Sequence, residues 1–235
     1  APGMAIEKDG VHILVLPGPP RELKPMFQNC AVPYLMQFSD RIIVSHNIRT
    51  FGIGESSMAE RVNDLFDAQN PTVAPYAKDG EALLRVTAMA KTKEDAESLC
   101  EPVIEEIKKR LDAYVYGVDY NCIEEAAVAM LKEHHLKVAT AESCTGGLIA
   151  KRITDVPGAS EVFECGIISY ANEIKHKVLD VSEDDLNKYG AVSEPVAKHR
   201  AQGALKVSGA DIAVSVTGIA GPDSDSTGKP VGLVY

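Results

Sequence analysis

The last third of the chain contains short, continuous apolar runs, and each run ends in small, hydroxylated and charged residues. Three such runs occupy residues 137–140, 163–168 and 211–216. A continuous apolar run bounded by polar residues is typical of a strand that is buried on both faces. Apolar residues at helical spacing separate the runs at 148–153 and 194–205. The pattern predicts an α/β domain in which the polar strand ends converge at one edge of a sheet.

The middle of the chain has a different pattern. Residues 41–46, 72–76 and 83–90 have the composition of strands, and residues 55–66 and 93–111 carry apolar side chains at helical spacing. Strands interleaved with two helices predict a small α+β sandwich.

The start of the chain predicts one further strand and one helix. The strand covers residues 11–16, and the helix covers residues 23–38 with an interruption near Pro33. The segment 117–121, Gly-Val-Asp-Tyr-Asn, is predicted to be a linker. We therefore predict three regions, which are residues 1–39, 40–118 and 119–235.

Charge and composition exclude several functional classes. The chain carries 24 Lys and Arg against 34 Asp and Glu, a net charge of −10. Nucleic-acid binding relies on dense positive charge, so we expect no nucleic-acid partner. No apolar run approaches the ~18 residues of a membrane span, so we expect no membrane partner. Five scattered cysteines without a Cys-x-x-Cys pair suit a reducing cytoplasm and give no zinc signature.

The turn Ser143–Gly147, with the sequence Ser-Cys-Thr-Gly-Gly, lies between a predicted strand and a predicted helix. Hydroxyl and free backbone N–H groups at such a junction stabilise anions and oxyanions. Considered one at a time, each of these features has a more common structural explanation. Such a turn is usually an ordinary polar N-cap, and a lysine such as Lys175 is usually solvated. Tyr170 would usually be a half-buried aromatic residue, and Thr217 would usually cap a turn. Their joint occurrence at three predicted strand ends favours a shared site.

The residue types at these strand ends suit amide hydrolysis, which needs a nucleophile, a base and donors for the oxyanion. Ser143 is the candidate nucleophile, and its neighbour Cys144 is a rival because thiolates are intrinsically reactive. Lys175 serves as a general base if burial lowers its pKa towards neutrality. The N–H groups of Thr145, Gly146 and Gly147 suit oxyanion stabilisation, and the loop that begins at Thr217 and Gly218 suits a phosphate-bearing ligand.

Four motifs in a fixed order carry a resemblance to a known family. They are AESCTGGLIA (141–150), the stretch from VPGAS to CGIISYANEIKHKVLDV (156–181), GAVSEPVA (190–197) and SVTGIAGPD (215–223). Through them residues 122–235 resemble the C-terminal domain of the CinA (competence/damage-inducible) family, the nicotinamide-nucleotide amidohydrolases. Residues 40–118 resemble the family's KH-like middle domain, and residues 15–26 resemble the end of its molybdopterin-cofactor-binding-like α/β domain.

The resemblance implies a function and roles for individual residues. The substrate implied is nicotinamide mononucleotide, deamidated to the nicotinate nucleotide with release of ammonia and without a cofactor. Ser143 is implied as the nucleophile, with Tyr170, Lys175 and Thr217 as further site residues. No metal is expected in this domain, and a homodimer is left open.

Two alternatives remain at the level of the sequence. The first is a non-enzymatic, nucleotide-binding scaffold protein associated with competence. The second is pyrophosphatase activity, with a divalent metal, in the N-terminal domain of a longer protein. Compared with the family, we expect further residues at both ends of the chain, including an arginine that meets the substrate phosphate.

Overall fold

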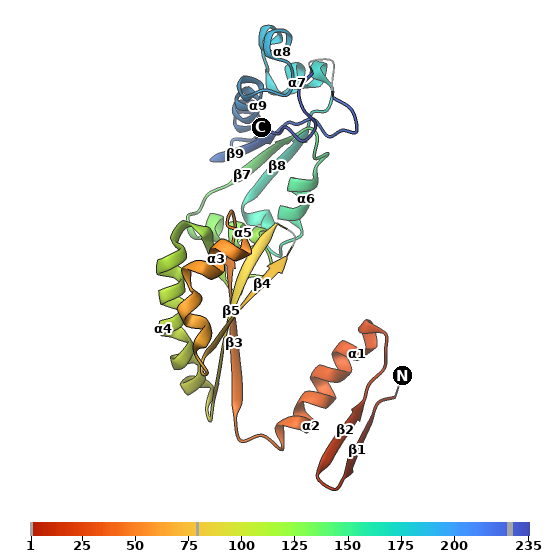
Figure 1. Ribbon diagram of the computed structural model, residues 1–235. Helices are drawn as coiled ribbons and strands as arrows, with labels where there is room; N and C mark the ends of the chain where they lie inside the picture. Colours follow the sequence, from red (N-terminus) through yellow and green to blue (C-terminus); the bar gives the residue numbers. More distant parts are fainter. Residues whose placement is uncertain (1, 79, 225–227) are drawn as a thin grey trace. The chain divides into compact units, whose positions relative to one another are not determined.

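The protein is described by a computed structural model that covers residues 2–78, 80–224 and 228–235. The chain forms two compact units, Ala1–Asp119 and Tyr120–Tyr235, which are coloured red to green and green to blue in Figure 1. The division between the units lies next to the predicted boundary between residues 118 and 119. The boundary predicted after residue 39 lies inside the first unit and stays a prediction.

The first unit begins with an antiparallel hairpin followed by a helical stretch. Its elements are β1 (Met4–Lys8), β2 (Val11–Val15), α1 (Pro20–Met26), a π-helical segment (Phe27–Ala31) and α2 (Val32–Met36). The helix was predicted, whereas β1 was not. The π-helical segment ends just before Pro33, which has no N–H to donate to the preceding turn, so the hydrogen-bond pattern changes where the interruption was predicted.

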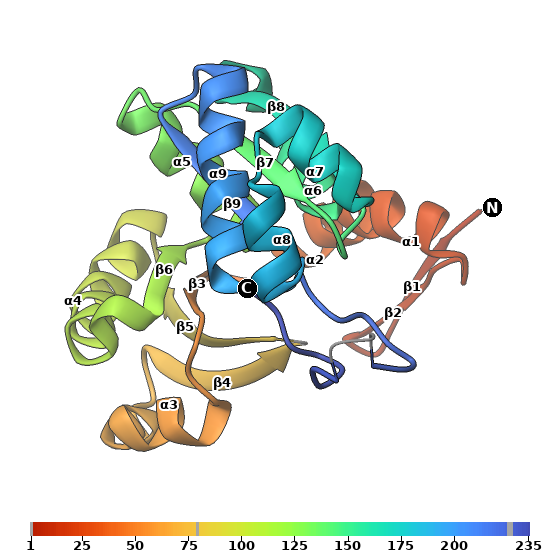
Figure 2. The same cartoon turned by 90° about the horizontal axis from the view of Figure 1, so that it is seen from above.

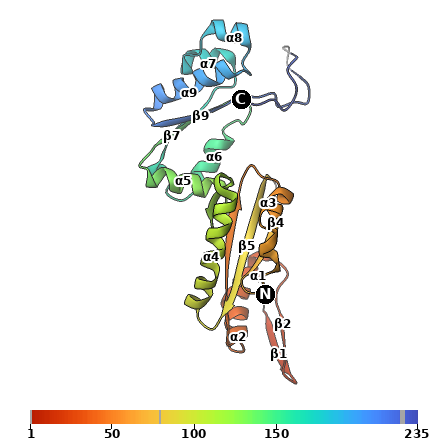
Figure 3. The ribbon, with the colours of Figure 1, turned by 60° about the vertical axis from the view of Figure 1, so that its left-hand side comes forward.

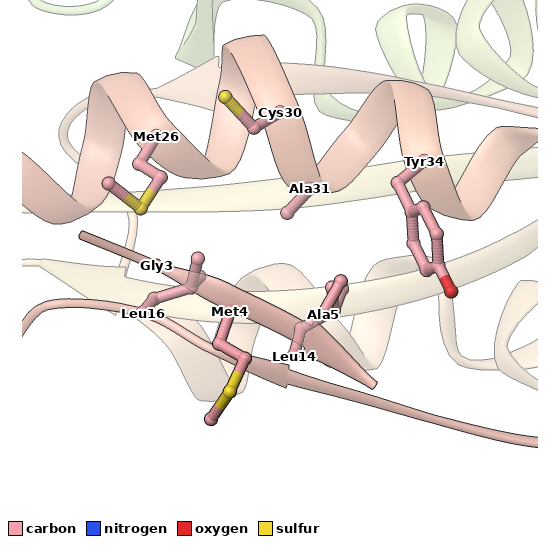
Figure 4. A pocket seen from close by; sticks show the side chains of 9 residues that line it. All are labelled: Gly3, Met4, Ala5, Leu14, Leu16, Met26, Cys30, Ala31 and Tyr34. Atoms are coloured by element: carbon pink, nitrogen blue, oxygen red, sulfur yellow. The ribbon is translucent and has the colours of Figure 1, made fainter. Parts of the chain in front are cut away.

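An apolar cavity of about 340 Å³ lies between this helical stretch and the hairpin. Figure 4 shows Met26, Ala31 and Tyr34 from the helix lining it together with Gly3 and Leu14 from the hairpin. Its lining is mostly apolar, as expected where a helix covers one face of a hairpin.

The remainder of the first unit is an antiparallel sheet of order β4-β5-β3-β6. Its elements are β3 (Ile42–Thr50), α3 (Glu55–Arg61), a 3₁₀ turn (Asn63–Asp67), β4 (Thr72–Lys78), β5 (Glu81–Ala90), α4 (Lys93–Leu111), a second 3₁₀ turn (Asp112–Tyr114) and β6 (Val115–Val118). The predicted α+β sandwich is confirmed, and α4 has the predicted bounds. Its N-cap is Thr92, whose hydroxyl accepts a hydrogen bond from Asp95 N (3.1 Å).

Two predictions for this region were wrong in detail. The helix predicted over 55–66 ends at Arg61 and continues only as a 3₁₀ turn. Part of the predicted linker belongs to β6, where Val118 pairs with Ile48 of β3. A four-residue strand containing Gly117 has little local strand signal, so only its tertiary pairing reveals it.

The core of this sheet is apolar. The side chains of α3 and α4 cover one face of the sheet and form one buried cluster with the strands, which includes Ile48, Met58, Leu84, Ile107 and Leu111. Burial of this cluster is the main source of stability of the first unit.

The second unit is built on a parallel sheet of order β8-β7-β9. Its elements are α5 (Ile123–Glu133), β7 (Val138–Glu142), α6 (Leu148–Thr154), a 3₁₀ turn (Ala159–Glu161), β8 (Phe163–Ile168), α7 (Asn172–Leu179), α8 (Glu183–Tyr189), α9 (Glu194–Ser208) and β9 (Ile212–Val216). The predicted α/β fold is confirmed. The helices α7 and α8 were not predicted, and near the end of the chain a bridge joins Gly218 to Val234.

Helices cover the parallel sheet from both sides. Figure 3 shows α7, α8 and α9 on one side and α5 and α6 on the other, and Figure 2 shows α7, α8 and α9 gathered together. Ala139 and Ala141 of β7 face α9 in a small apolar cluster, whereas Glu142 faces α6. The two sides of β7 therefore differ, because one is apolar and the other ends in a buried carboxylate.

Candidate active site

The register of the parallel sheet brings three chain segments together. Glu142, the last residue of β7, pairs with Ile168 of β8 and with Val216 of β9. Neighbouring strands lie about 4.8 Å apart, so the residues that follow these three are adjacent. Ser143 N donates to Val216 O (3.1 Å) and Ser169 N donates to Glu142 O (2.9 Å). The structure thus brings the three predicted strand ends to one edge.

Ser143 lies at the centre of this edge, directly after the central strand. Only 8% of the residue is exposed, and its hydroxyl has no hydrogen-bond partner within the described part of the chain. The next side chain, Cys144, points to the loop after β9, because its Sγ lies 3.2 Å from the position that a Cβ on Gly218 would take. Gly218 therefore allows the two loops to pack closely.

Glu142 organises the turn that follows Ser143. Its carboxylate accepts hydrogen bonds from Gly147 N (3.1 Å), Ile149 N (2.9 Å) and Ala150 N (2.8 Å). Burial opposes ionisation, but the hydrogen bond from Ala150 N and further donors outweigh it and hold the pKa of Glu142 below its ordinary value. The Thr145 hydroxyl contributes to this electrostatically, although it makes no hydrogen bond of normal geometry.

This arrangement changes the expected set of oxyanion donors. Gly147 N is bonded to Glu142, and Gly146 N is bonded to Ser143 O (3.1 Å). The N–H groups of Cys144 and Thr145 have no partner in the regions that the structure describes. These two N–H groups, rather than those of the glycines, are available to a ligand. The backbone conformation explains why residue 147 is a glycine, since its φ of +98° is one that other residues rarely adopt.

Lys175 lies on α7 and only 1% of it is exposed. Its Nζ donates to Tyr170 O (2.6 Å). Burial, and to a lesser extent the positive charge of Arg200, together lower the pKa of Lys175 to about 8. Lys175 therefore meets the condition that a lysine base requires. In this arrangement no hydrogen bond joins its amine to the Ser143 hydroxyl.

The other two predicted side chains are placed differently from each other. Tyr170 is 74% exposed, and the structure involves its carbonyl rather than its phenol in binding Lys175. Thr217 is buried, and its hydroxyl donates to Ala191 O (3.0 Å) in the loop before α9. The catalytic role of Tyr170 and the ligand-binding roles of Thr145 and Thr217 stay predictions.

Two charged residues of this edge were not recognised in the sequence. Glu142 closes a strand in which every residue is buried, and Arg200 lies in the buried stripe of α9 between Val196 and Ala204. The signal for Arg200 was present, because a charged residue at a core position of an amphipathic helix needs a partner in the interior.

The described residues show neither a metal site nor a membrane-spanning helix. Within residues 2–78, 80–224 and 228–235, no three His, Cys, Asp or Glu side chains are grouped to hold a metal ion. In the same ranges no helix combines the length and the apolar character needed to cross a membrane.

Comparison with known proteins identifies both units. Residues 121–235 match the family model described as the CinA C-terminal domain, and residues 45–117 match the damage-inducible protein CinA KH domain. The chain is 52% identical to a CinA-like protein of Dictyoglomus turgidum, covering 100% of this chain and 57% of the relative. A CinA-like protein of Dictyoglomus thermophilum is 51% identical, with 100% and 57% covered.

A solved structure is also similar to part of the chain. The competence/damage inducible protein CihA from Agrobacterium tumefaciens is 46% identical, with 47% of this chain and 67% of that chain covered and a TM-score of 0.46. The chain spans 57% of the length of the Dictyoglomus relatives. With the family's KH domain followed by its C-terminal domain, the chain belongs to the CinA family.

Proposed function

We propose that the second unit is an amide hydrolase that converts nicotinamide mononucleotide to nicotinate mononucleotide and ammonia. Ser143 is the nucleophile and Lys175 is the general base. The observation that carries this proposal is the Lys175 amine, which is buried at the edge that bears Ser143 and has its pKa lowered to about 8. The substrate comes from the family resemblance, and the chemistry comes from the side chains.

The reaction proceeds in two halves. The Ser143 oxygen attacks the carboxamide carbon of the nicotinamide ring while the neutral Lys175 amine accepts the hydroxyl proton. The C–N bond then breaks, the proton passes from Lys175 to the leaving nitrogen, and ammonia departs from an ester on Ser143. Water attacks the ester with Lys175 again as the base, which frees the nicotinate carboxylate and restores the serine hydroxyl.

The oxyanion of each half-reaction needs fixed donors. The N–H groups of Cys144 and Thr145 suit this role, because they directly follow the nucleophile and have no partner elsewhere in the described residues.

Ammonia release tests this proposal. The chain is incubated with nicotinamide mononucleotide, and ammonia and nicotinate mononucleotide are both quantified. We expect turnover by the wild type, a loss of about 10³-fold or more in Ser143→Ala, and near-normal turnover in the matched variant Cys144→Ala. The opposite pattern would transfer the nucleophile role to the thiol.

The same material separates an enzyme from a nucleotide-binding protein. If calorimetry shows binding of the mononucleotide to the wild type and no ammonia appears, the hydrolase proposal is wrong and the binding alternative is supported. If Ser143→Ala binds the mononucleotide as the wild type does, the lost turnover belongs to the chemical step and not to binding.

A further inference from the structure

Among the described residues, Arg200 is the largest side chain that is fully buried. It extends from α9 to the ends of all three parallel strands. Nη1 donates to Val216 O (2.7 Å), and Nη2 donates to Ala141 O (2.9 Å) and to Ser169 Oγ (3.3 Å). Each partner lies within two residues of Ser143, Tyr170 or Thr217. One planar group is therefore bonded to every segment that carries a predicted site residue.

The oxygen partners of this guanidinium are neutral, so its charge is not cancelled by direct contact. Burial lowers the pKa of Arg200 to about 10, while the neighbouring Cys144 and the Glu142 carboxylate act in the opposite direction. Arginine thus stays protonated at neutral pH. Its Nε–H has no partner within the described chain. Among the described residues, the result is a buried positive charge that the Glu142 carboxylate opposes without a direct hydrogen bond.

A proton on Lys175 would add a second buried cation to this edge. The charge of Arg200 already disfavours that proton, and Glu142 accepts hydrogen bonds from three backbone N–H groups, those of the N-cap Gly147 and of Ile149 and Ala150 in α6. Two buried cations with one carboxylate would leave an uncompensated charge, which proteins avoid by neutralising one group. The arrangement of these three side chains therefore makes the Lys175 amine lose its proton at a lower pH than an ordinary lysine does.

Other ionisable groups that pack near α7 have partners of their own. His176 Nδ1 lies 2.8 Å from Val181 O, and the α8 carboxylates of Glu183 and Asp185 lie 3.8 Å from His176 Nε2 and 3.0 Å from His199 Nδ1. On the outer face of α9, Lys206 pairs with Asp180 (3.1 Å) and is 74% exposed, so solvent screens its charge. Arg200 therefore differs from the surface cations of its own helix.

We propose that Arg200 is the positioning residue of this site: its buried fork holds the three strand ends in register, and its positive charge adds to burial in disfavouring a proton on the neighbouring Lys175 amine. The inference rests on the proposed function only where it assigns Lys175 the role of general base. Arg200 touches no substrate in this account and acts through Lys175 and the strand ends.

The test follows the protonation of Lys175 directly by NMR, without substrate. The whole chain is labelled with ¹³C at lysine Cε, and the Lys175 signal is assigned as the one absent from Lys175→Met. Its titration is compared in the wild type, in Arg200→Gln, which removes the charge and keeps one donor, and in Arg200→Lys, which keeps the charge and loses the fork. Lys206→Gln is the matched control on the same helix.

We expect a midpoint of about 8 in the wild type and in the control. In Arg200→Gln the midpoint rises above 8 but stays below the ordinary lysine value of 10.5, because burial, the larger cause, remains, and in Arg200→Lys it stays near 8. Both Arg200 variants melt at a lower temperature than the wild type, because strand-end carbonyls lose donors. A folded Arg200→Gln protein with an unchanged midpoint would overturn the proposal.

Arg200→Lys decides alone if Arg200→Gln does not fold. A midpoint that stays near 8 with a lowered Tm supports the proposal, and a midpoint that rises above 8 overturns it, since the charge is still present. Failure of the proposed function looks different. A wild type that releases no ammonia but shows the expected Lys175 titrations would refute the hydrolase proposal and leave this inference intact.

Discussion

Among the described residues each unit buries one arginine, and the two differ in whether a carboxylate contacts the guanidinium. In the first unit Arg49 lies 3.4 Å from the Glu81 carboxylate, which also accepts a hydrogen bond from Tyr116 Oη (2.8 Å). In the second unit Arg200 hydrogen-bonds, within the described residues, only to carbonyl and hydroxyl oxygens. A carboxylate in contact cancels the charge of Arg49 locally, whereas the charge of Arg200 reaches its neighbour Lys175.

The surroundings of the two arginines differ in the same sense. The first unit has one large apolar cluster that does not include Arg49, and Arg49 is paired with the Glu81 carboxylate. The apolar cluster of the second unit is small, and Glu142, Lys175 and Arg200 are buried at the ends of its strands. Buried charges without a direct partner lower the stability of the folded state. Where a protein retains them, they are often part of a functional site. The contrast therefore separates a structural ion pair from a site.

The largest expected effect is the loss of activity when Lys175, the proposed base beside Arg200, is replaced. Lys175→Met and Lys175→Arg should both lower kcat by about 10²–10⁴-fold, because arginine keeps a charge but accepts no proton at accessible pH. Rates of ammonia release are measured for both variants beside Lys198→Arg, an exposed lysine of α9. An active Lys175→Arg protein would reduce Lys175 to an electrostatic contact and require another base.

The second effect tests whether the ion pair of the first unit is structural only. Glu81→Gln leaves Arg49, which is only 6% exposed, without its carboxylate and should destabilise the first unit by about 3 kcal/mol. Urea unfolding followed through NMR signals of β5 measures the change. Ammonia release should be unaffected. A parallel loss of activity would show that the arginine of the first unit also serves the site.

The third effect concerns helix packing behind the site. A Cβ on Gly203 of α9 would lie 2.1 Å from Leu179 O at the end of α7, so Gly203→Ala must push the two helices apart. We expect a loss of about 1–3 kcal/mol in the second unit, together with reduced activity, because α7 carries Lys175. Gly18→Ala in the first unit is the control, since nothing lies within 4 Å of its Cβ position. Equal melting temperatures for both variants would contradict the packing as described.

Much of the architecture follows from the sequence because its signals are local. The apolar runs that became β7, β8 and β9, and the 3.6-residue spacing of α4, need no knowledge of the rest of the chain. β6 and α7 were missed for opposite reasons. β6 is a strand only because β3 offers it a partner, and the residues of α7 were interpreted as a loop that carries chemistry. The capping residue Ser182, whose hydroxyl accepts from Asp185 N, was a usable signal for α8.

The site was predictable in its residue types but not in its electrostatics. Ser143 and Lys175 were proposed from their places at strand ends, and the structure buries both. The partners of the turn N–H groups were not predictable, because the Glu142 carboxylate accepts hydrogen bonds from Ile149 N and Ala150 N only once the first turn of α6 has formed. Arg200 was overlooked because its function depends on three strands that are far apart in sequence.

The smallest effect sharpens the comparison through the pH dependence of stability. The pKa of Lys175 is about 8 in the folded protein and 10.5 in its ordinary state, so the unfolded chain binds more protons between these values. The cost of burying Lys175 is thus fully present below pH 8 and is relieved as the pH rises to about 10.5, with a slope of at most about 1.4 kcal/mol per pH unit. Lys175→Met lacks this cost, so its stability advantage over the wild type should shrink as the pH rises from 7.5 to 10. Urea unfolding followed through NMR signals of β7 measures the difference, with Lys198→Met, a lysine that is 70% exposed, as the control. A stability difference that does not change with pH would mean that Lys175 is not neutralised by folding, and the contrast between the two buried arginines would lose its functional meaning.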